Sequence, residues 1–253
     1  MIGISDRRVR LLTVVVGVAG LIAAGAQPAA AQDISVNFAQ GSGLTERVIQ
    51  MIALLTVLSL APSILVMMTS FTRIVVVLSL LRTALGTATA PPNAVIVSLA
   101  LFLTAFVMGP VFQTAYEAGV RPLMAGEIDA EQAFGRSAEP FQAFMMKNVR
   151  DKDLKLFLDL SRVPRPEKVE DVPLRIVVPA FMISELKRAF EIGFLLFLPF
   201  LIIDLVVASV LMSMGMMMLP PVVVSLPFKL IFFVLVDGWS LVAGSLVQSY
   251  GSG

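Results

Sequence analysis

Long apolar runs alternate with polar stretches after residue 47 of the chain. Four apolar blocks cover residues 48–81, 93–112, 189–219 and 222–247. At 1.5 Å per residue, the first block would extend about 50 Å as one helix, against about 30 Å of hydrocarbon in a bilayer. It is therefore either a helix that projects from a membrane or two packed segments. The pattern predicts an all-α, membrane-associated fold.

Every apolar block carries a proline, within it or near its end, at Pro62, Pro110, Pro199 and Pro227. Proline interrupts the backbone hydrogen-bond ladder, and lipid offers no replacement donors. Neighbouring chains must then satisfy the freed carbonyl groups. Ordinary kinks in membrane helices are the alternative, but four prolines in four blocks favour kinked helical hairpins buried in an oligomer.

A polar region, residues 113–188, separates the second and third apolar blocks. Its twelve Lys and Arg residues balance twelve Asp and Glu residues, so its charge does not assign it to one side of a membrane. Residues 147–160 have the spacing of an amphipathic helix, and the proline-rich residues 161–173 are typical of a linker. We expect a small polar helical subdomain outside the lipid, inserted between residues 32–112 and residues 189–253. Counting four complete crossings from an exported N-terminus places it in the periplasm.

Residues 1–31 have the organisation of a secretory signal peptide. Three arginines precede an apolar run, and small residues lead to an Ala29-x-Ala31 site. This order is typical of a cleaved export signal, and we expect cleavage after Ala31. An uncleaved signal anchor is the alternative, although the apolar run is short for a span. The signal predicts that the segment after Ala31 lies outside the cytoplasm, and together with the four apolar blocks it favours a multi-pass protein of a bacterial inner membrane.

Composition excludes several kinds of chemistry. The chain is 57% hydrophobic and only 15% charged, where soluble domains carry about 25% charged residues. A net charge of +1 argues against a nucleic-acid partner. The chain has neither Cys nor His, which removes thiolate and imidazole metal ligands and the usual general base. We therefore expect no metal, no cofactor and no enzymatic activity.

Two charges inside the last two apolar blocks predict an ion pair. An unpaired charge at the bilayer centre costs about 2.5–3.5 kcal/mol. Asp204 precedes Met216 by almost the same distance along the chain as Lys229 follows Met218. In a hairpin that turns at the methionines, the two side chains arrive at a similar depth.

A second charged group lies at the start of the third apolar block. Its members follow i, i+3 and i, i+4 spacing on a helix, which predicts a charged network. An exposed helix end with solvated ions is the alternative. The group consists of Glu185, Lys187, Arg188 and Glu191.

A methionine-rich segment, residues 211–221, connects the last two apolar blocks. It contains the consecutive Met216, Met217 and Met218, and it ends on Pro220 and Pro221. The proline pair stops a helix there, and methionine is flexible and repacks easily. The segment predicts a soft apolar turn that can act as a deformable seal. Core filling at a helix end is the alternative.

Five sequence motifs lie within about residues 51–239. They are PAFMISELKRAFEIGF at 179–194, LPFKLIFFVLVDGW at 226–239, MMMLPP at 216–221, TSFTRIVVVL at 69–78 and PPN at 91–93. In order and spacing these motifs resemble those of the flagellar FliP family and its virulence counterparts in type III secretion.

This resemblance implies a subunit of the export gate in the flagellar basal body. In the family, several copies, expected to be five, assemble with FliQ and FliR and with other membrane proteins of the export apparatus. Unfolded flagellar subunits pass through the central pore. Met216, Met217 and Met218 correspond to the family's gasket, and Glu185, Asp204 and Lys229 to its buried charges.

Three other functions remain open at this stage. A virulence-type secretion gate would share the same motifs. A small-solute transporter would often show internal repeats, and the two halves show no convincing similarity. An intramembrane aspartyl protease could pair Asp204 with Asp237, but Lys229 is the nearer partner for Asp204.

Overall fold

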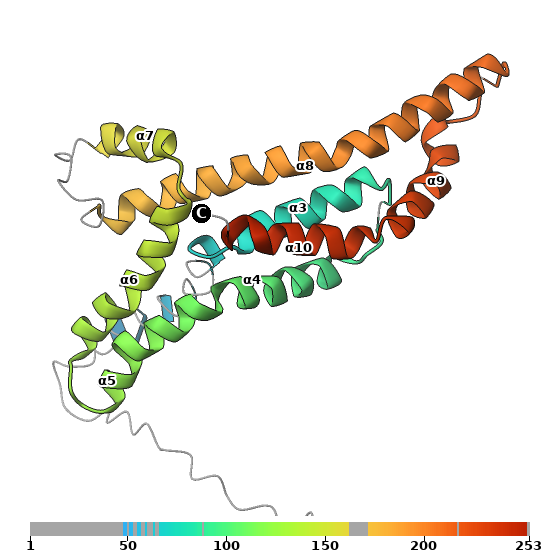
Figure 1. The fold of residues 1–253 in the computed structure, drawn as a ribbon. Helices are drawn as coiled ribbons and strands as arrows, with labels where there is room; N and C mark the ends of the chain where they lie inside the picture. Colours follow the sequence, from blue (N-terminus) through green and yellow to red (C-terminus); the bar gives the residue numbers. More distant parts are fainter. Residues whose placement is uncertain are drawn as a thin grey trace, which may run out of the picture. The chain divides into compact units, whose positions relative to one another are not determined.

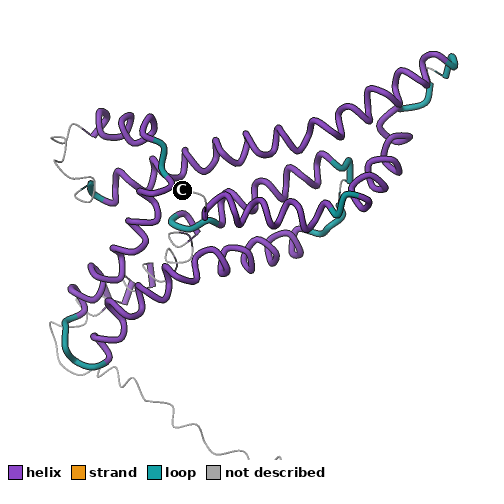
Figure 2. Tube along the Cα trace, in the orientation of Figure 1, coloured by secondary structure: helices purple, strands orange, loops and turns teal. Residues whose placement is uncertain are grey.

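A computed structural model describes residues 48–49, 51–52, 55–56, 59, 63, 66–87, 89–161, 172–216 and 218–251 (Figure 1). Helices dominate these residues, and no strand occurs among them (Figure 2). The all-α fold expected from the apolar pattern is therefore confirmed. The signal peptide with its cleavage site, Pro62, most of the expected linker and Met217 lie outside the described residues.

The chain divides into two units, residues 1–55 and 56–253. In the first unit, the described residues 48–49, 51–52 and 55 are helical. The second unit contains the elements named in Figure 1 together with one π-helical turn, η1. In chain order they are α3 (Phe71–Ala84), α4 (Asn93–Ala115), η1 (Tyr116–Val120), α5 (Arg121–Met124), α6 (Ala130–Asn148), α7 (Asp151–Ser161), α8 (Leu174–Ser213), α9 (Pro221–Leu235) and α10 (Gly238–Gly251).

The larger core forms where α3 packs against α4 and α8, and α10 contributes to it. The buried face of α3 repeats at helical spacing, and burial of each such side chain contributes about 1.5–3 kcal/mol. Gly193 lets α8 approach closely, because a Cβ there would lie 2.3 Å from Leu80. The fully buried members of α3 are Ile74, Val77, Leu78 and Leu81.

A smaller core joins the polar region to the first turns of α8. Met145 of α6 packs with Val177 and Phe181 of α8, and side chains of α7 cover them. The prediction of one amphipathic helix at 147–160 is wrong at its start, because α6 ends at Asn148 and α7 begins at Asp151. The backbone between them is extended at Val149, and no i, i+4 bond crosses an extended residue.

Two apolar blocks are interrupted at places that their prolines do not mark. The first block contains a turn at residues 68–70, before α3 begins, so it is not one long helix. The fourth block bends by 62° between α9 and α10, at Asp237, whose φ is +50°. In contrast, the helices continue through Pro110 and Pro199. The described breaks thus lie at turn residues, and the helices also continue through Pro227.

Two helical segments of the described chain are long and apolar enough to cross a membrane. They are Asn93–Met124 and Leu174–Ser213, and the bent pair α9–α10 makes a third if it counts as one span. The 14 residues of α3 reach only about 21 Å, less than the hydrocarbon thickness. The described residues therefore do not support the expectation of four complete crossings. Without that count, the polar region cannot be assigned to one side of the membrane.

Candidate functional site

The methionine-rich turn caps the hairpin of α8 and α9. α8 ends in a Schellman motif: Gly215 adopts a φ of +74°, its N–H donates to the Met212 carbonyl, and the Met216 N–H donates to the Leu211 carbonyl. Only glycine takes this backbone conformation without steric cost. Pro221 begins α9 at a position where its missing N–H costs nothing.

The described methionines of this turn are open to their surroundings. Met218 is 98% exposed, and Met214 and Met216 are 66% and 41% exposed. Figure 1 shows the turn at the far end of α8, away from α10 and α4. Within this protomer the turn is therefore not core filling, and its apolar surface is available for contact with another chain. We call Met214, Met216 and Met218 the tip methionines.

Asp204 and Lys229 meet across the hairpin below the tip. Lys229 Nζ lies 2.7 Å from Asp204 Oδ2 and 3.3 Å from the carbonyl oxygen of Ala84, at the end of α3. The Ser225 hydroxyl donates to the other carboxylate oxygen. The Lys229 side chain is 5% exposed and that of Asp204 is 28% exposed. The pair thus connects α3, α8 and α9 at one point.

A second ion pair, between Arg73 and Glu185, is fully buried. The Arg73 guanidinium donates through Nε and Nη2 to the two oxygens of Glu185, and the two side chains are 1% and 0% exposed. Tyr250 donates to Glu185 as well, and its ring lies 3.9 Å below the guanidinium carbon. Ser249 accepts a further bond from Arg73. This cluster holds the last turn of α10 against α3 and α8.

The sequence analysis missed this cluster. Arg73 is the only charge in its apolar block, and such a lone charge indicates a buried counter-charge. Glu185 lies 112 residues further along the chain, so no helical spacing could identify it as the partner.

The structure divides the expected charged network. Glu185 turns into the core, whereas Lys187 lies 3.8 Å from the exposed Glu191. Arg150 of the polar region lies 4.0 Å from Glu191. Arg188 makes no ion pair among the described residues. Because Lys187 and Glu191 are more than half exposed, their attraction is screened and contributes little.

Asp153 anchors α7 to α8. Its carboxylate accepts bonds from Ser184 at 2.7 Å and from Arg150 at 2.8 and 3.0 Å. Burial raises the pKa of the Asp153 carboxyl, but the hydrogen bonds of Ser184 and Arg150 and the charges of Arg150 and Lys187 outweigh it, so the pKa lies below its usual value of 3.8. The ionised form therefore stabilises the fold at neutral pH.

We expect Asp153→Asn to cost about 1–2 kcal/mol in the free energy of unfolding at pH 7, because the charged acceptor is lost. A lowered folded pKa adds stability above pH 3.8 that disappears as the pH falls through the folded pKa. The gap between wild type and variant should therefore close below pH 3.8. Unfolding in detergent across pH measures it. Asp151→Asn, an exposed carboxylate on the same helix, is the control and should change little.

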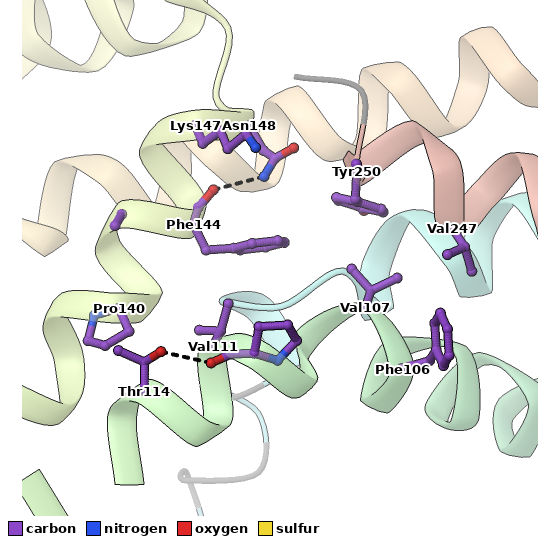
Figure 3. Close-up of a pocket in the computed structure, with 13 residues that line it drawn as sticks. Phe106, Val107, Val111, Thr114, Pro140, Phe144, Lys147, Asn148, Val247 and Tyr250 are labelled. Atoms are coloured by element: carbon purple, nitrogen blue, oxygen red, sulfur yellow. Dashed lines mark hydrogen bonds between the residues drawn. The ribbon is translucent and has the colours of Figure 1, made fainter. Parts of the chain in front are cut away.

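A cavity of about 560 Å³ lies between α4, α6 and the end of α10 (Figure 3). Its lining is mainly apolar, and Tyr250 closes one side by stacking on Phe144 at 5.8 Å. Asn148 turns back to donate to the Phe144 carbonyl. No carboxylate lines the cavity, and no cluster of three Asp or Glu residues in the described part of the chain could hold a metal ion.

The fold and the site define an all-helical, membrane-associated protein whose bent hairpins are joined by buried ion pairs. Comparison with known proteins places the chain more closely. The model of the FliP family matches residues 54–246, and the chain belongs to this family.

Curated relatives agree with the family assignment, and each is called flagellar biosynthetic protein FliP. The protein of Caulobacter vibrioides is 60% identical over 242 residues, which cover 94% of this chain and 91% of that protein. The protein of Bacillus subtilis is 56% identical, over 80% of this chain and 91% of its own length. The protein of Aquifex aeolicus is 52% identical, over 83% and 89%.

Proposed function

We propose that this chain is a subunit of the flagellar protein export gate. Several copies, five by resemblance to the family, would enclose a pore together with FliQ and FliR, in the basal body at the bacterial inner membrane. Unfolded flagellar subunits would pass through this pore. The relatives named flagellar biosynthetic proteins support this role over a virulence system.

The exposed Met216 and Met218 carry the proposal. An idle gate must hold back ions, yet it must open for an extended polypeptide of any sequence. Thioether side chains close a ring by dispersion contacts and adapt at small rotamer cost, and an apolar constriction resists wetting. Rigid branched side chains would fit a single shape. Met216, Met217 and Met218 of each copy would line this constriction.

The rest of the hairpin gives the seal a firm base. α8 continues without a break for 40 residues, and the Asp204–Lys229 pair joins it to α9 and to the end of α3. The ion pair therefore restrains movement of α8 relative to α9. We further propose that residues 1–31 are a cleaved signal and that residues 113–188 form a subdomain outside the lipid.

Replacing Met216, Met217 and Met218 together with alanine should leave assembly intact but raise membrane conductance severalfold, because smaller side chains leave the constriction open. Ion flux through membranes that contain the complex measures the leak. Met124→Ala is the control, since Met124 is also exposed, at 77%, but lies on α5. Unchanged flux in the triple variant, with the complex assembled, would contradict the seal.

The contacts do not favour the protease alternative. Asp204 is bonded to Lys229 and Ser225, and no hydrogen bond joins it to Asp237 among the described residues. The Lys229 ammonium group thus occupies the place beside Asp204 that a second carboxylate would need in order to share a proton with it.

A further inference from the structure

Nearly every charge within the apolar blocks of the described chain has a partner of opposite sign. Arg73 pairs with Glu185, and Lys229 pairs with Asp204. Glu191 lies near Lys187. The exception is Asp237, for which the described residues provide no ion pair. Just beyond the first apolar block, Arg82 is likewise without a carboxylate partner among them.

Asp237 lies in an apolar surface. It forms the joint between α9 and α10, with its side chain exposed. Of the large apolar side chains within four residues of it in the sequence, Phe233 is buried and five others are exposed. Lipid hydrocarbon could cover them, but hydrocarbon offers a carboxylate no counter-charge. The surface therefore fits a protein partner that supplies a cation. The flanking side chains are Val234 at 74% exposure, Leu235 at 80%, Val236 at 39%, Trp239 at 39% and Leu241 at 58%.

Arg82 provides such a cation. It lies in the last turn of α3, is partly exposed, and uses Nη1 to bond Asn93 Oδ1 and the Pro91 carbonyl. Neither Nε nor Nη2 of Arg82 donates a hydrogen bond to a described residue. A guanidinium has five donors in a planar fork that matches a carboxylate. The contacts of Arg82 with Asn93 and Pro91 therefore leave donors that can bind a carboxylate.

Arg82 and Asp237 lie at the same end of the helical unit. The end of α3 contacts α9, since the Ala84 carbonyl accepts a bond from Lys229, and in the view of Figure 1 the end of α3 and the α9–α10 joint both lie toward the same end of α10. Arg188, another cation without an ion pair in the described part of the chain, is near Tyr250 at the opposite end of α10. The 14 residues of α10 separate these ends by about 20 Å.

We propose that Asp237 of one copy binds Arg82 of the neighbouring copy. This inference rests on the proposed function, because it requires several copies around one axis. Wherever two copies of this chain are neighbours around the axis, they make the same head-to-tail contact, and residues at one level of a copy face that level in the next. Each interface then contains one complementary pair, and the apolar surface around Asp237 is covered by the neighbour.

Cross-linking between differently tagged copies tests the contact directly. The chain has no cysteine, so Arg82→Cys with one tag and Asp237→Cys with a second tag each introduce a single thiol. An Arg–Asp pair separates its β-carbons further than a disulfide spans, so a short bis-maleimide is the probe. In membranes that contain both chains we expect a product carrying both tags. Lys155→Cys, on an exposed face of α7, replaces Arg82→Cys in the control and should give none.

Charge reversal provides the second arm. Arg82→Glu or Asp237→Arg alone should lower the amount of assembled complex by about tenfold or more, because each places like charges at the interface. The two changes in one chain should restore assembly, since every interface regains a complementary pair. Lys155→Glu is the control and should leave assembly unchanged.

The outcomes separate the inference from the proposed function. If the wild-type chain is purified only as a monomer, the proposed function fails. If an oligomer forms without the mixed-tag product and without rescue by the double reversal, only the Arg82–Asp237 contact is wrong. A further variant carries both Arg82→Cys and Asp237→Cys in one chain. If its cross-link forms only within that chain and never between two chains, the inference is also wrong.

Discussion

Replacing Glu185 with alanine should lower the free energy of unfolding by about 3–5 kcal/mol, because the change leaves Arg73 buried without its counter-charge. The Arg73 side chain is 1% exposed, so water cannot replace the lost carboxylate. Tyr250 loses its acceptor at the same time, which loosens the last turn of α10. Chemical unfolding in detergent, followed by helical circular dichroism, measures the loss.

Two further variants identify the cause of this loss. Glu191→Ala removes an exposed carboxylate from the same helix and should change stability by about 1 kcal/mol or less. The double variant Arg73→Met with Glu185→Leu should recover most of the loss, because a buried pair can be exchanged for apolar side chains at little net cost. Wild-type stability in Glu185→Ala alone would show that the buried pair does not form.

The second large effect concerns the pair below the tip methionines. Asp204→Leu should destabilise the protein by about 3–5 kcal/mol, and Lys229→Met by less, because the two partners differ in burial. The change at Asp204 isolates an ammonium group whose side chain is 5% exposed, whereas the carboxylate isolated by Lys229→Met is 28% exposed. Ser225 also continues to donate to that carboxylate. Motility should be lost in both variants.

A double-mutant cycle measures the coupling of the pair. The combined variant Asp204→Leu, Lys229→Met should be less destabilised than the sum of the single changes, since neither charge is then isolated. Lys187→Met, which removes an exposed lysine from α8, is the control. Equal losses for the two single variants, or strictly additive ones, would rule out a buried pair that acts as a unit.

Local contacts account for what could be predicted before the structure. The turn at the methionines follows from a run that must end at a proline pair. Asp204 and Lys229 lie on the two arms of one hairpin, so the rise per residue is enough to bring them to one depth. The positions of the helical blocks follow from apolar runs in the same way. The extent of α8 does not, because this helix begins at Leu174, within the polar region and well before its apolar block.

The amino-acid sequence by itself determined the apolar helices, the hairpin turn and the similar depth of Asp204 and Lys229. Each of these depends on contacts within one or two helices. Only the tertiary structure decided that Arg73 binds Glu185 and Tyr250, that the last block bends at Asp237, and that Glu185 leaves its neighbours on α8. The hydrogen bonds of Glu185 with Arg73 and Tyr250 join residues 112 and 65 positions apart. They depend on how whole helices pack, and packing selects one of many partners that have equal local spacing.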